Sequence, residues 1–347
     1  MTFKNTPLII IVIFLSLTSC KVSRDKLASK VSKWENFMTK TDITEDDIRL
    51  HIGVLASDEM KGRESGSPDE ALAAEYIKNK FESLGLKAFN NNYIQTFSAP
   101  VNKYVTNTVI YYNSNSEEKK TTSSQNVIAY MEASNSKREN DYILIGAHYD
   151  HIGTDAINNT ILINNGADDN ASGVAGMLEI AEKLLSLDNF KYNVIFVAFG
   201  AEELGLVGSY YFCNNPPVPL EKIKFMYNLD MIGRMDSNNG VYMNTIEPND
   251  NLSVIVDAIK GSHTEINTSF LYDYYLRGSD HTPFFKNNIP VISFTTGIHS
   301  DYHKPSDVID SINFGGQKLL LDFVYDMVIS PAMDEYIRSF TSSSVSP

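Results

Sequence analysis

Four short apolar segments of this sequence are each followed by residues that can bind metal ions or move protons. Imidazole and carboxylate groups, with no cysteine among them, suit Zn²⁺, and one carboxylate can bridge two ions. A water molecule shared by two ions becomes a nucleophile, and a glutamate outside the ligand set is needed to take its proton. The residues are His148 and Asp150 after Tyr142–Ala147, Glu202 and Glu203 after Val194–Phe199, Asp230 after Lys224–Leu229, and His303 after Val291–Phe294.

A fifth polar group, Gly166-Ala167-Asp168-Asp169-Asn170, begins a helical pattern. Taken singly, each group has an ordinary explanation: aspartates cap helices, glutamates favour helix N-termini, and histidines are often buried in cores. Asp230 is the least expected, because an unpaired buried carboxylate is costly. Five such coincidences at equivalent positions favour one shared site. Spacing alone does not separate Asp168 from Asp169 as a ligand.

The elements that must position these residues alternate between buried strands and amphipathic helices. This alternation predicts an α/β fold, a three-layer sandwich whose mostly parallel central sheet carries helices on both faces. The carboxyl ends of parallel strands share one edge of the sheet, where sites form in open α/β folds. Besides the four apolar segments, we expect helices at 45–57, 71–84, 171–187 and 317–329, strand-like stretches at 92–98, 104–113 and 126–131, and a polar surface turn at 113–125.

Five motifs follow one another along the chain: Gly146-Ala147-His148-Tyr149-Asp150, Gly166-Ala167-Asp168-Asp169-Asn170-Ala171-Ser172-Gly173, Ala201-Glu202-Glu203-Leu204-Gly205, Asn228-Leu229-Asp230 and Tyr302-His303. In this order they resemble the co-catalytic di-zinc aminopeptidase family, which includes secreted bacterial leucyl-type aminopeptidases, glutamate carboxypeptidases and glutaminyl cyclases. The resemblance covers about residues 44–335 and implies a zinc-exopeptidase-like fold.

Carried over position by position, the resemblance implies two Zn²⁺ per chain and Glu202 as the general base. It also implies a cis peptide between Asp169 and Asn170. Asp150 would hold the ring of His148, as carboxylates behind metal ligands do, and Asp280 is a possible neighbour of the site. The implied ligands are His148 and Asp230 for one zinc, Glu203 and His303 for the other, and Asp169 as the bridge.

We expect from this resemblance an aminopeptidase that hydrolyses the N-terminal residues of peptides with a free N-terminus. A carboxypeptidase or dipeptidase for acidic substrates would need an arginine cluster, and only Arg234 and Arg277 lie near the motifs. A glutaminyl cyclase would use one zinc. A non-catalytic binding relative should have lost ligands, whereas all five ligand positions and the base are present.

Composition restricts the partners and the location of the protein. The formal net charge of −14 over 347 residues, with no basic block, argues against nucleic-acid binding. Lys4, an apolar run from Leu8 to Leu17 and small residues before Cys20 are typical of a lipoprotein signal peptide over 1–19. This run is too short to span a bilayer.

The signal predicts a lipid on Cys20, a tether over 20–43 and a location in the cell envelope, bound to the membrane outside the cytoplasm. The di-zinc peptidase domain should then occupy 44–335, followed by a flexible tail at 336–347. Cys213 is the only other cysteine, so the mature chain has no internal disulfide, and we interpret Cys213 as a small buried hydrophobic residue.

Overall fold

The computed structural model describes residues 42–100, 103–106, 109–112, 121–134, 140–157, 160–188, 190–245, 250–271 and 278–343. The expected signal peptide, Cys20, most of the tether and Arg277 lie outside these residues. None of the helices in the described part of the chain is both long and apolar enough to cross a membrane.

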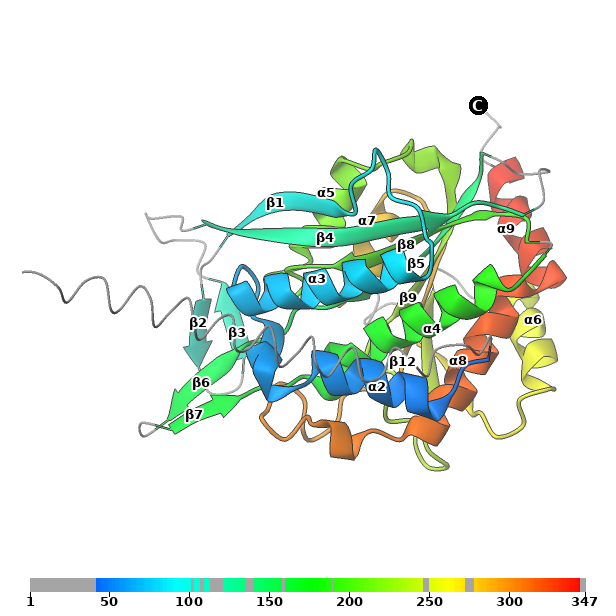
Figure 1. The fold of residues 1–347 in the computed structure, drawn as a ribbon. Helices are drawn as coiled ribbons and strands as arrows, with labels where there is room; N and C mark the ends of the chain where they lie inside the picture. Colours follow the sequence, from blue (N-terminus) through cyan, green and yellow to red (C-terminus); the bar gives the residue numbers. More distant parts are fainter. Residues whose placement is uncertain are drawn as a thin grey trace, which may run out of the picture. The chain divides into compact units, whose positions relative to one another are not determined.

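A mixed sheet of eight strands forms the centre of the fold (Figure 1). Its order is β1-β4-β8-β5-β9-β12-β10-β11. The four inner neighbours β8, β5, β9 and β12 run parallel, whereas β1, β4 and β10 pair antiparallel to their inner neighbours. The bounds are β1 Ile94–Pro100, β4 Thr121–Met131, β5 Tyr142–His148, β8 Asn193–Phe199, β9 Ile223–Leu229, β10 Val241–Thr245, β11 Thr268–Leu271 and β12 Val291–Thr295.

Helices cover both faces of this sheet, as the alternating pattern predicts. α3 (Pro68–Ser83) and α4 (Gly173–Leu185) pack against strands on one face, with α2 (Glu45–Leu55) and α8 (Phe314–Ile329) beside α4 (Figure 1). The other face carries α5 (Val207–Asn214) and α7 (His281–Lys286), and α6 (Asp250–Lys260) packs against α8. Two antiparallel hairpins, β2 Lys103–Thr106 with β3 Val109–Tyr112 and β6 Thr154–Ile157 with β7 Thr160–Ile163, lie outside the main sheet.

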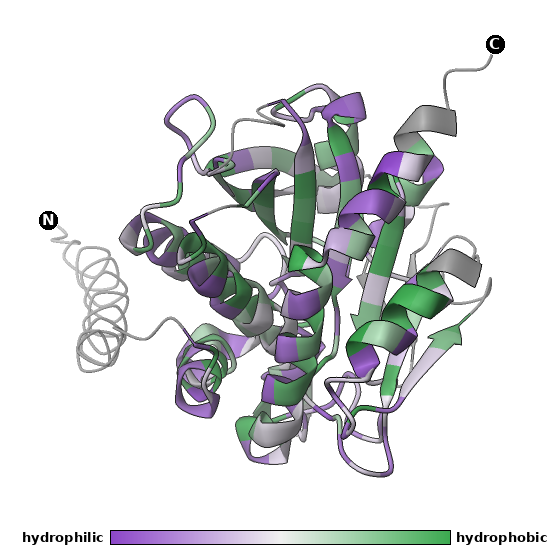
Figure 2. Ribbon diagram, turned by 90° about the vertical axis from the view of Figure 1, so that its right-hand side faces the viewer, coloured by the Kyte–Doolittle hydropathy of each residue, from purple (hydrophilic) through white to green (hydrophobic). Residues whose placement is uncertain are grey.

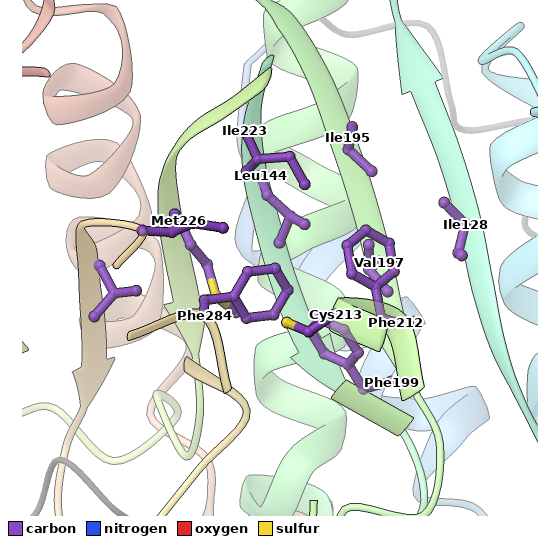
Figure 3. Packing of buried hydrophobic residues seen from close by; sticks show 12 residues of the cluster. Ile128, Leu144, Ile195, Val197, Phe199, Phe212, Cys213, Ile223, Met226 and Phe284 are labelled. Atoms are coloured by element: carbon purple, nitrogen blue, oxygen red, sulfur yellow. The ribbon is translucent and has the colours of Figure 1, made fainter. Parts of the chain in front are cut away.

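The hydrophobic core lies between the sheet and its helices. Every residue of β8 is buried, which matches its continuous apolar run. Figure 2 shows hydrophobic strands in the centre and helices with alternating polar and apolar faces. On the face covered by α5 and α7, Phe212 and Phe284 pack against Phe199, and Cys213 is a buried member of the same cluster (Figure 3). The burial of Cys213 confirms its interpretation as a small buried residue, and its thiol is free in the described part of the chain.

Two expected segments differ from the structure. The tail expected from 336 is wrong over most of its length, because α9 spans Pro331–Ser343. Met333, Tyr336 and Ile337 recur at three and four residues and are buried, and α9 packs against β9. The polar segment expected as a turn up to 125 also differs, because β4 begins at Thr121 and pairs with β1 from Pro100. The residues at this end of β4 are polar, so their sequence lacks the apolar alternation that indicates a strand. Backbone hydrogen bonds to β1 stabilise them in the sheet.

Candidate metal centre

The predicted ligands meet at the carboxyl edge of the four parallel strands. His148 is the last residue of β5, and Asp230 directly follows β9. Glu202 and Glu203 lie in the turn after β8, and His303 lies in the loop after β12. The parallel registers of these strands place their ends side by side, so residues 155 positions apart in sequence can reach one site.

One group of possible metal ligands contains His148, Asp169 and Asp230. His148 Nε2 lies 3.3 Å from Asp169 Oδ1 and 3.4 Å from Asp230 Oδ1. Ligand atoms at zinc distances of about 2.0–2.2 Å in a tetrahedron lie about 3.3–3.6 Å apart. The two distances from His148 therefore match the spacing around one tetrahedral cation, and all three donor atoms lie within 4.8 Å of one another.

A second group contains Asp169, Glu203, His303 and, in addition, His151. His303 Nε2 lies 3.2 Å from Asp169 Oδ2 and 3.3 Å from Glu203 Oε1. Asp169 thus directs Oδ1 toward the first group and Oδ2 toward the second. This is the arrangement that a carboxylate bridging two cations needs.

The structure places Asp169, rather than Asp168, between the two groups. Asp168 turns away: its Oδ1 accepts the backbone N–H of Gly233 at 2.6 Å, and its Oδ2 lies 3.1 Å from His299 Nε2. The Asp307 carboxylate accepts the backbone N–H groups of both aspartates. The peptide between Asp169 and Asn170 is cis, as the family resemblance implies.

Glu202 belongs to neither ligand group but lines the same cavity as His148, Asp169 and Glu203. Burial and the neighbouring carboxylates of Glu203 and Asp280 raise the pKa of Glu202 well above its usual value. A carboxyl group with a raised pKa beside a ligand cluster has the properties of a general base or acid.

The Asp150 carboxylate makes contacts that the sequence did not predict. His148 Nδ1 lies 3.3 Å from the backbone carbonyl oxygen of Asp150 and 3.9 Å from its Oδ1. The carboxylate oxygens instead accept the backbone N–H groups of Glu202 at 3.0 Å and Glu203 at 3.2 Å, and the hydroxyl of Ser65 at 2.6 Å. Asp150 therefore anchors the turn that carries the two glutamates.

The histidine and carboxylate groups of this centre strongly shift one another's pKa values. Burial alone would lower the pKa of His148, yet the carboxylates of Glu202 and Asp230 raise it well above its ordinary value. Burial likewise opposes ionisation of Asp169, but hydrogen bonding to His148 and the charge of His151 lower its pKa well below the usual range. Several buried carboxylates at one point need cationic partners, and metal ions supply that charge most compactly.

Two residues of this region were not predicted from the sequence. His151 joins the second ligand group, although its only signal is an imidazole three residues after His148. Arg63 is fully buried, and its guanidinium donates to the carbonyl oxygens of Tyr149, Asn165 and Gly166 next to the site. Burial lowers the pKa of Arg63 to about 10. Neither residue lies in a periodic segment.

A cavity of about 600 Å³ opens onto both ligand groups. Among the described residues that line it there is no lysine or arginine. Arg234 is engaged elsewhere, with its guanidinium 3.0 Å from Asp307 and 3.3 Å from Asp301. Asp280 is buried and does not line the cavity, although the adjacent Ser279 and His281 do. Apart from these two residues, Glu202 and the ligand residues, the lining mixes apolar residues and glycines with neutral polar ones: Met231, Leu271, Ile298, Gly278, Gly297, Tyr242, Tyr302, Asn239, Asn244, Ser293, Thr295 and Thr296.

Comparison with known proteins finds curated relatives that are aminopeptidases. An aminopeptidase of Bacillus subtilis, YwaD, is 31% identical over 199 residues, covering 55% of this chain and 41% of that protein. Leucine aminopeptidase 2 of Trichophyton rubrum is 28% identical over 256 residues, covering 64% and 46%. The chain thus spans less than half the length of these two curated relatives.

Solved structures share the fold at lower identity. The aminopeptidase from Aneurinibacillus sp. strain AM-1 superposes with a TM-score of 0.62 at 20% identity, covering 83% of this chain and 96% of that one. The glutaminyl cyclase of Porphyromonas gingivalis gives a TM-score of 0.59 at 18% identity, covering 84% and 98%. The sequence itself matches peptidase family M28 over residues 126–328, more than half of the chain and the part that holds all five predicted ligands. This chain belongs to peptidase family M28.

Proposed function

We propose that the protein is a two-metal aminopeptidase that removes N-terminal residues from peptides. The observation that carries this proposal is the position of Asp169, whose two carboxylate oxygens face two separate ligand groups, while Glu202 lines the same cavity and belongs to neither group. Nitrogen and oxygen donors at these spacings suit Zn²⁺. Two bound ions would polarise a scissile carbonyl group and lower the pKa of a water molecule.

The residues of the chain would then divide the remaining work. Glu202 is placed to accept the proton of a water molecule in the cavity and to return it to the leaving amine. Asp150 fixes the backbone of Glu202 and Glu203, so that one side chain serves as base while the other serves as ligand. The acidic cavity favours the ammonium group of a free peptide N-terminus.

The lining of the cavity argues against an acidic-substrate carboxypeptidase. Such an enzyme needs cationic groups to hold carboxylates. No described lining residue is cationic, and Arg234 is already paired with Asp301 and Asp307. A glutaminyl cyclase shares the fold, but two ligand groups joined by Asp169 favour the two-metal reaction.

The decisive assay compares aminoacyl anilides that have a free N-terminus with the same compounds after N-acetylation. We expect the purified protein to cleave only the free compounds, to lose this activity with a chelator, and to regain it with Zn²⁺. Cyclisation of N-terminal glutamine in place of cleavage would establish the cyclase. Cleavage of N-blocked peptides at their C-terminus would establish the carboxypeptidase.

We also propose that the protein is exported and lipid-anchored through Cys20, with residues 20–43 as anchor and tether at the outside of the cytoplasmic or outer membrane. The support is the sequence pattern before Cys20. The full-length protein expressed in a bacterial host should partition with membranes and lose residues 1–19, whereas a Cys20→Ala variant should remain unprocessed. A wild-type protein that keeps its first nineteen residues would contradict the proposal.

A further inference from the structure

His151 is an imidazole that the five-ligand set of the resemblance does not include. Its side chain is buried, with 1% of the residue exposed. His151 Nδ1 lies 3.0 Å from Glu203 Oε1 and 3.6 Å from Asp169 Oδ2. The nitrogen therefore lies near the same two carboxylate oxygens that His303 Nε2 approaches.

The surroundings of His151 fix its ring in this direction. The backbone N–H of His151 donates to the carbonyl oxygen of Arg63 at 3.2 Å. Gly166 packs so close that a Cβ atom there would lie 2.6 Å from two ring carbons of His151. The rings of His151 and His303 meet edge to face, with centroids 5.6 Å apart. Nε2 has no hydrogen-bond partner among the described residues, so Nδ1 makes the polar contacts of this side chain.

The four donor atoms of this group lie close enough together to surround one cation, all within 4.8 Å of one another. The four distances from the two imidazole nitrogens to the two carboxylate oxygens run from 3.0 to 3.6 Å, near the value of about 3.3–3.6 Å for zinc ligands in a tetrahedron. We propose that His151, through Nδ1, is a fourth protein ligand of the ion held by Asp169, Glu203 and His303. This inference rests on the proposed two-metal function.

A fourth ligand makes the two sites chemically unequal. Four protein ligands fill a tetrahedral zinc site, whereas three leave a position open for water or substrate. The group of Asp169, Glu203, His303 and His151 is then the tighter site, where a water molecule shared with the other ion would be a fifth ligand. The group of His148, Asp169 and Asp230 keeps the open position. Metal ions should therefore fill the His151 site first, and the open site beside Glu202 should exchange its ion more readily.

The alternative role for His151 is a hydrogen bond donated from Nδ1–H to Glu203, with no bond to metal. Nuclear magnetic resonance of the wild-type protein separates the two roles. With ¹⁵N-labelled histidine and ¹¹³Cd²⁺ as the probe, a ligating ring nitrogen couples to the metal and a hydrogen-bonding one does not. We expect three coupled nitrogens, two Nε2 from His148 and His303 and one Nδ1 from His151. Two coupled Nε2 nitrogens alone would overturn the inference and leave the proposed function intact, whereas a complete absence of coupling would contradict both.

A substitution tests the same bond through affinity. His151→Gln keeps a group that can donate to Glu203 but removes the imidazole ligand. Loss of a residue that only supports a ligand costs about 10–100-fold in metal affinity. We expect the variant to weaken Zn²⁺ binding at one of two sites by more than this, measured by competition with a chromophoric chelator. A loss of 100-fold or less would overturn the inference.

The matched control is His51→Gln. His51 is equally buried and lies 3.3 Å from Glu179, but it belongs to neither ligand group. Both Zn²⁺ affinities of this variant should equal those of the wild type. If His51→Gln weakened one site as strongly as His151→Gln, the effect would be one of general stability and the inference would fail. The measurement on the wild-type protein decides the question if a variant does not fold.

Discussion

Two clusters of histidine and carboxylate residues in the described part of the chain are both buried but differ in charge, because one favours neutral side chains and the other favours charged ones. In the first, His51 of α2 lies between Tyr76 of α3 and Glu179 of α4, with Nδ1 2.6 Å from the tyrosine hydroxyl oxygen. Burial lowers the pKa of His51 to about 3 and raises that of Glu179 to about 8. Both groups are therefore neutral near pH 7.

In the metal centre His303 and Glu203 instead favour their charged forms until a bound metal ion replaces the imidazole proton. Burial opposes protonation of His303, but Asp169 and Glu203 raise its pKa to about 10. Burial and Asp169 oppose ionisation of Glu203, yet hydrogen bonds with His151 and His303 lower its pKa to about 2. Where one imidazole faces one carboxylate, desolvation keeps both groups neutral. Where several of each meet, their mutual attraction outweighs desolvation and favours the charged forms. The number of groups that converge, rather than burial, distinguishes a cation site from a packed polar pair.

Asp169→Asn should produce the largest difference between the clusters. The amide offers one oxygen where two carboxylate oxygens face two groups, so we expect loss of metal and of turnover. Metal ions supply several kcal/mol of transition-state stabilisation, which corresponds to about 10³-fold or more in rate. Metal analysis and kcat/KM check this. Glu179→Gln, the same change in the first cluster, should retain both metal and turnover; equal losses in the two variants would contradict the comparison.

Glu202→Gln should separate proton transfer from metal binding. Because Glu202 lies outside both ligand groups, the variant should keep its metal content while kcat falls by about 10²–10⁴-fold, the range for general base catalysis. Glu203→Gln should instead lose metal. If Glu202→Gln turned over at the wild-type rate, the assignment of the base would be wrong.

Asp150→Asn should have a smaller effect through the turn after β8. The carboxylate accepts both the Glu202 and Glu203 N–H groups, and an amide can accept only one of them well. We expect metal affinity to fall by about 10–100-fold, as for other residues that support ligands. Chelator competition measures this, and Ser65→Ala, which removes one contact to the same carboxylate, should cost less. A larger loss in Ser65→Ala would show that the turn is not the target.

The smallest effect is expected on stability, from Glu179→Gln. The raised pKa of Glu179 means that the folded state holds a proton that the unfolded state releases, so stability falls as pH rises from about 4.5 to about 8. The lowered pKa of His51 makes stability rise with pH instead, but only below about pH 6.5. Between pH 6.5 and 8, Glu179→Gln should therefore gain stability relative to the wild type, by at most about 2 kcal/mol. Urea denaturation at both pH values measures the difference, and a constant difference would contradict the neutral state of Glu179.

Much of the fold and site follows from local sequence. Apolar runs locate β5, β8, β9 and β12, and the side chains at their ends form the ligand groups. The family resemblance is needed to choose Asp169 over its neighbour, because both follow the same glycine turn. His151 and Arg63 could not be predicted, since their roles arise from loops whose course depends on tertiary packing. The direction of the Asp150 carboxylate depends on the backbone of a turn about fifty residues away in sequence.

The most direct test of a site that holds two cations through Asp169 is the metal stoichiometry of the chelated and reconstituted protein. Titration with Zn²⁺, followed by removal of loosely bound metal and elemental analysis, should give two ions per chain for the wild type and for Glu179→Gln. The same titration of Asp169→Asn should give fewer than two. One ion per chain in the wild type, or two ions in Asp169→Asn with unchanged affinity, would contradict the account.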